Sequence, residues 1–267
     1  MYKRQFDGSG DLWLSILTPG GGSLCRAAHD SWGTAVEQVV TQIDGAPLGA
    51  VSAVEAAPDG RIYFAVAASA SAADGLESTL RTELLAHTGT GCVYVYDPAA
   101  RTVQKVLGGV AGASGLALSR DGSTLYVSDL ANRCVWRVSA DAQDLTAGGK
   151  NCSSLVSGLP GYPGALAMDP DGTLYIGYRW ARSSWLEKNA GSTLLRGIAL
   201  RAGRNLQEKL FSLPVDAPCA EAVDTADGSW QRVVSGRGAG SVTALCPVES
   251  RLYLGLADSE KVRSANL

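Results

Sequence analysis

Histidine is almost absent from this chain, with two among 267 residues, at positions 29 and 87. We expect His29, beside Asp30, to be exposed at a blade edge, and His87 to end a helix, where a cation suits the helix dipole. The six cysteines are scattered and include no C-x-x-C pair, which argues against a structural zinc site. They are either disulfides of a secreted protein or buried thiols, and we favour buried thiols.

Long apolar runs and a basic excess are also missing. No uninterrupted apolar stretch reaches about 18 residues, so we expect no membrane-spanning helix. The net charge is −3 and no long basic run occurs, which gives no electrostatic basis for binding nucleic acid. The sequence contains neither a G-x-S-x-G nucleophile motif nor a phosphate-binding P-loop. These absences leave few of the familiar catalytic signatures.

Glycine-rich hairpins are what the chain has in abundance. The sequence is 46% hydrophobic and contains 32 glycines, as expected for a globular protein with many turns. The stretch ASGLALSRDGSTLYVSD at 113–129 alternates apolar residues on both sides of an Asp-Gly turn. Such a pattern predicts a β-hairpin.

Versions of this hairpin recur along the chain. Five units match, at 6–16, 51–66, 113–129, 163–178 and 242–257. Each carries an aromatic residue in the same place, and these anchors are Trp13, Tyr63, Tyr126, Tyr175 and Tyr253. Intervening segments such as 91–107 supply further strands, giving about four strands per unit. This arithmetic predicts an all-β propeller; the alternative is a β-sandwich with coincidental turns.

Two inserts interrupt the repeats. Residues 74–87 place four leucines on one helical stripe, with Asp74 as the expected N-cap. Residues 179–200 form the second insert and contain Trp180. We expect the inserts at one end of the channel, either as a lid or as packing elements.

Four collinear stretches carry a specific resemblance: 44–64, 89–107, 114–122 and 159–177. Together they resemble the strictosidine synthase-like family of six-bladed β-propellers, which is related to the calcium-dependent lactonases of the gluconolactonase and paraoxonase type. Residues 240–267 resemble the family's closing blade. The resemblance implies a small-molecule ligand in the axial channel, a monomer, and a secretory or endomembrane location.

The resemblance also points to positions where this chain departs from its relatives. The lactonases have Asn, Asn and Asp in three channel-facing slots, and here those slots hold Ser52, Ser114 and Gly164. Calcium needs about six to eight oxygen ligands, typically including carboxylates, so we predict no bound metal and no other cofactor. Thr243 occupies the slot of the catalytic glutamate of strictosidine synthase and cannot act as its acid/base.

The catalytic residue therefore stays unknown; Asp129 is a candidate, and its alternative role is to cap a turn. Ser52, Ser114, Gly164, Thr243 and Trp180 are the predicted ligand-binding residues. The chain is either an enzyme of the lyase or hydrolase type, independent of metal, or a non-catalytic propeller that binds a ligand or a protein.

The N-terminus is unusual. Residues 1–5, MYKRQ, back-translate to a sequence like the end of a common sequencing adapter, so we interpret them as a non-native leader. Residues 6–267 are then a single propeller domain that is expected to lack its first blade through truncation. On this interpretation, the missing signal peptide says nothing about location.

Overall fold

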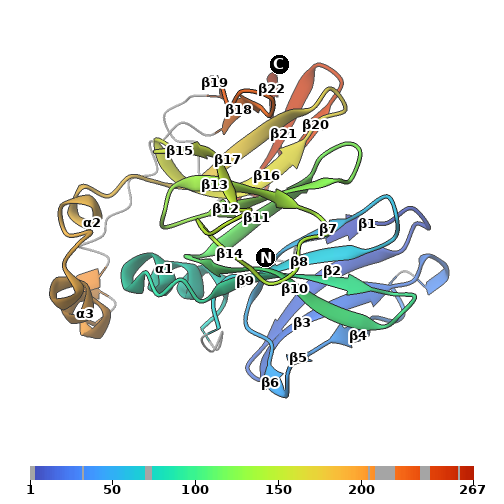
Figure 1. The fold of residues 1–267 in the computed structure, drawn as a ribbon, viewed down its shortest axis with the longest axis horizontal. Helices are drawn as coiled ribbons and strands as arrows, with labels where there is room; N and C mark the ends of the chain where they lie inside the picture. Colours follow the sequence, from blue (N-terminus) through green and yellow to red (C-terminus); the bar gives the residue numbers. More distant parts are fainter. Residues whose placement is uncertain are drawn as a thin grey trace.

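Five sheets of mainly antiparallel strands dominate the computed structural model (Figure 1). It describes residues 4–31, 33–69, 74–203, 205–207, 220–234, 241–257 and 259–267. We number the sheets as blades 1 to 5 in chain order. Within the described residues the propeller has five blades, where the family resemblance implies six. That a first blade is missing stays a prediction.

The blades are assembled from consecutive strands. Blade 1 contains β1 (Arg4–Phe6), β2 (Leu12–Thr18), β3 (Gly21–Ala27) and β4 (Glu37–Val40). Blade 2 contains β7 (Val51–Ala56), β8 (Ile62–Val66), β9 (Gly91–Asp97) and β10 (Thr102–Val110), with β14 (Leu145–Thr146) added in parallel. A 3-10 turn, His29–Ser31, lies between β3 and β4 of blade 1. A short ribbon of β5 (Gln42–Ile43) and β6 (Ala46–Pro47) joins blades 1 and 2.

Blades 3 and 4 repeat the four-stranded arrangement, and blade 5 has three strands within the described residues. Blade 3 contains β11 (Ala113–Leu118), β12 (Thr124–Asp129), β13 (Cys134–Ser139) and β15 (Ser153–Ser157). Blade 4 contains β16 (Gly161–Met168), β17 (Thr173–Ala181), β18 (Ala220–Asp224) and β19 (Trp230–Val234). Blade 5 contains β20 (Val242–Val248), β21 (Arg251–Leu256) and β22 (Arg263–Asn266).

The expected leader takes part in this architecture. Arg4 and Gln5 lie in β1 and pair with Leu14 and Trp13 of β2. Whether residues 1–5 are native stays a prediction, but the backbone of the last two continues the first sheet.

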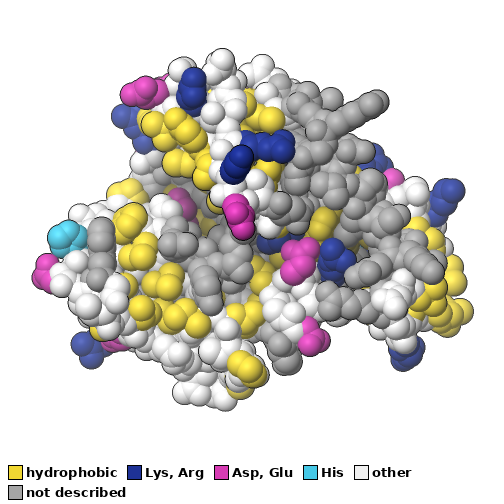
Figure 2. Space-filling model, turned by 180° about the vertical axis from the view of Figure 1, so that it is seen from behind, with side chains coloured by type: hydrophobic (Ala, Val, Ile, Leu, Met, Phe, Trp, Pro, Cys, Tyr) yellow, Lys and Arg dark blue, Asp and Glu magenta, His cyan; other side chains and the backbone are white. Residues whose placement is uncertain are grey.

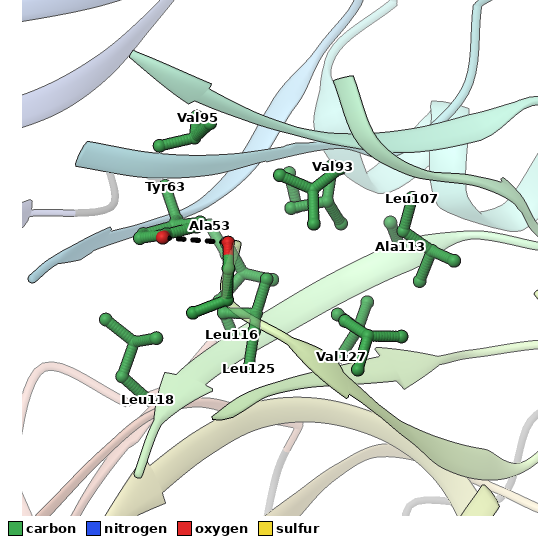
Figure 3. Packing of buried hydrophobic residues seen from close by; sticks show 14 of the residues in the cluster. Ala53, Tyr63, Val93, Val95, Leu107, Ala113, Leu116, Leu118, Leu125 and Val127 are labelled. Atoms are coloured by element: carbon green, nitrogen blue, oxygen red, sulfur yellow. Dashed lines mark hydrogen bonds between the residues drawn. The ribbon is translucent and has the colours of Figure 1, made fainter. Parts of the chain in front are cut away.

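The hydrophobic core lies between the blades rather than at the axis. A sheet with two apolar faces must bury both, and neighbouring blades cover each other. The layer between blades 2 and 3 shows the pattern: Ala53, Tyr63 and Val93 of blade 2 meet Leu116 and other residues of blade 3 (Figure 3). The Tyr63 hydroxyl donates a hydrogen bond to the carbonyl of Ala140 across this layer (3.0 Å; Figure 3).

The aromatic anchors of the repeats occupy equivalent places, as the sequence predicts. All five lie on the second strand of their blade, and four are at most 5% exposed: Trp13, Tyr63, Tyr126 and Tyr175. Each of the four belongs to the apolar layer between its own blade and the next. Tyr253 of blade 5, the last described blade, is 37% exposed.

Helices α1, α2 and α3 lie in the inserts and gather at one side of the molecule (Figure 1). Helix α1 (Leu76–Ala86) matches the predicted leucine stripe and follows β8, but its N-cap is Gly75 without a side-chain cap, so the expected Asp74 cap is wrong. Helices α2 (Ser184–Lys188) and α3 (Thr193–Arg201) follow β17. Because β17 runs to Ala181, residues 179–181 of the expected second insert belong to blade 4.

The charges on the surface and the state of the cysteines agree with what the composition predicts. Acidic and basic side chains are interspersed on the face in Figure 2, which fits a net charge of −3. Among the described residues, none of the helices has the length and apolarity needed to cross a membrane. The five described cysteines are free, and Cys25, Cys134 and Cys152 are buried; Cys219 lies outside the described residues.

Candidate functional site

Four predicted ligand-binding positions fall at one structural feature. Ser52, Ser114, Gly164 and Thr243 lie in the first strands of blades 2 to 5, each where the pairing register with the second strand shifts. Such a β-bulge re-aims a side chain and is frequent beside functional sites. The structure therefore brings the four slots into equivalent places, near the end of the propeller that carries α1. We call this end the α1 end.

The serine hydroxyls at these slots connect neighbouring blades. Ser52 Oγ donates a hydrogen bond to the carbonyl of Ala113, the residue before the next slot (2.6 Å). Ser114 Oγ donates in the same way to the carbonyl of Pro163, again the residue before the next slot (2.9 Å). Ser128 Oγ lies 2.9 Å from Ser114 Oγ and donates to the carbonyl of Gly164 (2.8 Å). Each hydroxyl has one proton, and these carbonyls can accept it.

The series is interrupted at Gly164, which has no side chain. A Cβ atom placed there would lie 3.3 Å from the carbonyl oxygen of Val242, the residue before the slot of Thr243. Gly115, next to the slot of Ser114, lies in the seam between blades 3 and 4, where the two sheets are in contact. A Cβ on Gly115 would meet the carbonyl oxygen of Gly164 at 2.1 Å. The blades thus approach each other closely at the slots.

A serine at position 164 should therefore restore the missing bond. We expect Gly164→Ser to be more stable than Gly164→Ala by about 1 kcal/mol, because only the serine hydroxyl can donate to the Val242 carbonyl. Both variants add the same Cβ, so the difference between their free energies of unfolding gives the contribution of the hydroxyl group. Urea denaturation measures it, and a serine variant no more stable than the alanine variant would contradict the geometry.

The residues at the slots do not fit a calcium ion. The hydroxyl groups of the two serines donate hydrogen bonds to carbonyls, and Gly164 has no side-chain oxygen that could coordinate a metal. Calcium requires about six to eight oxygen ligands. Among the described residues, no group of three or more His, Cys, Asp or Glu could hold a metal. The side chain of Arg179 starts beside Gly164, since its Cβ lies 3.3 Å from the place of a Cβ on that glycine.

Arg179 joins blade 4 to helix α1. Its side chain is 7% exposed, and Nη1 forms an ion pair with Glu77 Oε2 (2.9 Å). Burial lowers the pKa of the Arg179 guanidinium, while the charge of Glu77 acts in the opposite direction. Trp180 is 6% exposed and lies against the guanidinium groups of both Arg81 and Arg179, 5.5 and 5.8 Å from its ring centre. Trp180 is thus buried in β17 against two arginines, and its role in binding a ligand stays a prediction.

Asp129 and Thr243 both have local partners. Asp129 is fully buried and accepts hydrogen bonds from the Asn132 side chain (2.8 Å) and from Trp136 Nε1 (2.9 Å). Burial raises the pKa of Asp129, although these hydrogen bonds oppose the rise. Its geometry is that of a turn cap, the alternative considered from the sequence. Thr243 Oγ1 donates to the carbonyl of Gly255 within blade 5 (3.1 Å).

Glu55, the fifth residue of the first strand of blade 2, is not among the residues predicted from the sequence. Burial raises the pKa of its carboxyl group to about 7, although a hydrogen bond from the backbone of Leu118 opposes the rise. The signal was present, because a glutamate interrupts the apolar run VSAVEA of a strand that lines the propeller's interior.

Comparison with known proteins agrees with this architecture. The family model described as SMP-30/Gluconolactonase/LRE-like region matches residues 16–194, about two thirds of the chain. No curated protein matches the sequence.

Solved structures with the same fold are distant in sequence. A gluconolactonase from Xanthomonas campestris superposes with a TM-score of 0.61 at 15% identity, covering 94% of this chain and 67% of that one. A luciferin-regenerating enzyme gives 0.60 at 17% identity, covering 100% and 78%. A structure of a nidogen/laminin complex gives 0.64 at 14% identity, covering 99% and 75%. At these identities the likeness shows the fold alone.

Proposed function

The chain belongs to the SMP-30/gluconolactonase/LRE-like family, and we propose that it binds a small polar organic molecule at the α1 end of the channel without a calcium ion. One observation carries the proposal. The hydroxyls of Ser52 and Ser114, in slots where related lactonases have metal ligands, donate to carbonyls of the next blade. Their role is to hold the blades together.

Two buried donors beside Gly164 support a ligand at this place. Arg179 Nε and Ser241 Oγ are buried and have no hydrogen-bond acceptor among the described residues. Arg179 adjoins Gly164, and Ser241 precedes Val242, whose carbonyl faces the same glycine. A buried donor without an acceptor costs about 1–3 kcal/mol, which an accepting group of a ligand would offset.

Two finer assignments stay proposals. The relationship to strictosidine synthase-like proteins rests on the collinear motifs, while Thr243 at the glutamate slot removes the proton-transfer group of that chemistry. A gluconolactonase-like hydrolase that does not need calcium is the enzymatic form of the proposal. A propeller that only binds its ligand is the alternative.

Lactone hydrolysis with and without calcium tests this proposal. We expect the initial rate on an aldonolactone, corrected for spontaneous hydrolysis, to be the same in excess calcium as in excess chelator, because the slots present no calcium ligands. A chelator-insensitive rate above background favours the hydrolase, and a rate equal to background favours the binding protein. Activation by calcium would contradict both forms.

A further inference from the structure

The inserted helices line a cavity of their own. It is an open pocket of about 290 Å3, lined by residues of α1, α2, α3 and the turn that follows β12. The polar part of its wall consists of His87, Arg133, Tyr162, Arg182, Glu187 and Arg196, and the rest is leucine and alanine. None of these residues belongs to the slots, so this cavity goes beyond the proposed function.

The charge of the cavity wall is predominantly positive, with three guanidinium groups against one carboxylate. Glu187 is engaged with two of the three. It forms a two-point ion pair with Arg182, one contact being 2.6 Å, and lies 3.7 Å from Arg133. Arg133 also donates to the carbonyl of Leu159 (2.8 Å). The charge of Glu187 is thus shared between these two arginines.

Arg196 has no such carboxylate partner among the described residues. Its Nη2 lies 3.3 Å from His87 Nδ1, and His87 Nε2 lies 3.0 Å from Asn132 Oδ1. A proton on Nε2 lets the imidazole donate to Asn132 and accept from Arg196, so a neutral histidine satisfies both contacts. Arg196 Nε is buried and has no acceptor among the described residues. A cation with a buried unsatisfied N–H group calls for an anionic acceptor.

We propose that this cavity binds a small organic oxyanion, with Arg196 as its principal ligand-binding residue. A guanidinium offers a planar pair of donors that matches a carboxylate or a phosphate oxygen pair. The leucine and alanine wall suits an apolar body attached to the anionic group, and the volume suits a molecule about the size of an aromatic acid. Carboxylate and phosphate share this recognition chemistry.

Calorimetric titration of the whole chain with sodium benzoate and with inorganic phosphate tests the proposal. We expect saturable binding of benzoate, weakened about tenfold or more by Arg196→Gln, because a charge-assisted hydrogen bond is lost. The matched control is Arg201→Gln, which removes an exposed arginine from the same helix and should bind like the parent. Phosphate binding with the same dependence on Arg196 would also support the site and identify phosphate as its chemistry.

Ala190→Phe provides a second variant in case Arg196→Gln does not fold. It narrows the cavity from α2's end and leaves all three arginines in place, so benzoate binding should again fall about tenfold or more. The proposal is overturned if neither anion binds up to about 10 mM. It is also overturned if folded Arg196→Gln binds like the parent, or if Arg201→Gln weakens binding equally.

Discussion

Replacing Ser114 with alanine is expected to lower the free energy of unfolding by about 2 kcal/mol. The residue is 4% exposed, and its hydroxyl donates to the carbonyl of Pro163 and lies 2.9 Å from the Ser128 hydroxyl. Alanine leaves both groups with one partner fewer in the seam between blades 3 and 4. For a chain of this size, the loss corresponds to a fall in melting temperature of about 4–8 °C.

The control for this prediction is Ser157→Ala in the same blade. Ser157 is exposed at the end of β15, and removing an exposed hydroxyl should change stability by less than about 0.5 kcal/mol. Chemical denaturation of both variants gives the comparison. Equal effects of the two substitutions would show that the Ser114 hydroxyl does not hold the blades together.

Glu55 should make the protein less stable as the pH rises. Its carboxyl pKa is 4.5 when unperturbed and about 7 in the folded chain, mainly because of burial. Between these values the folded state retains a proton that the unfolded state releases, so stability is lost as the pH increases from about 4.5 to about 7. The full shift corresponds to at most about 3 kcal/mol, and partial exposure of the side chain reduces the expected effect to about 2 kcal/mol.

Glu55→Gln isolates this contribution, because glutamine keeps the shape and cannot ionise. As the pH rises from about 5 to about 8, we expect the free energy of unfolding of the variant to increase by about 2 kcal/mol relative to that of the parent. Glu37→Gln, at an exposed position of β4, is the matched control and should show no such gain. Chemical denaturation at both pH values measures the difference in free energy of unfolding between each variant and the parent. A Glu55→Gln difference that does not change with pH would refute the prediction.

The fold was largely predictable because the repeats encode it locally. Alternating apolar residues and Asp-Gly turns predict hairpins, and the common aromatic position predicts how they align. Tyr63 and Tyr126 indeed fill the layers between successive blades. The leucine stripe likewise predicted helix α1 correctly. Its N-cap was not predicted, because the cap residue is Gly75 and not the expected Asp74.

The chemistry of the slots could not be predicted in the same way. Sequence alignment finds the residue that occupies a slot, and the structure finds a bulge at each of the four positions. Whether a hydroxyl there faces a ligand or a neighbouring carbonyl depends on where the next blade lies. The partners of Ser52 and Ser114 are 61 and 49 residues further along the chain. Such distant contacts leave no local pattern.

Buried charges were missed for a related reason. Arg179 lies in β17 and its partner Glu77 in α1, 102 residues apart, so neither suggests the other in the sequence. The sequence predicts an insert over residues 179–200 that contains Trp180, but β17 continues to Ala181 and includes this tryptophan. An arginine or glutamate inside a predicted inner strand is therefore worth singling out, even without a motif.

Calcium binding by the intact protein tests the central claim most directly. The claim is that the slot hydroxyls form hydrogen bonds between blades and do not coordinate a metal. Isothermal titration of calcium into chelator-treated protein should give only heats of dilution, and the melting temperature should be the same in calcium as in chelator. A saturable heat of calcium binding that disappears in Ser114→Ala would contradict the account, because it would make the Ser114 oxygen a metal ligand.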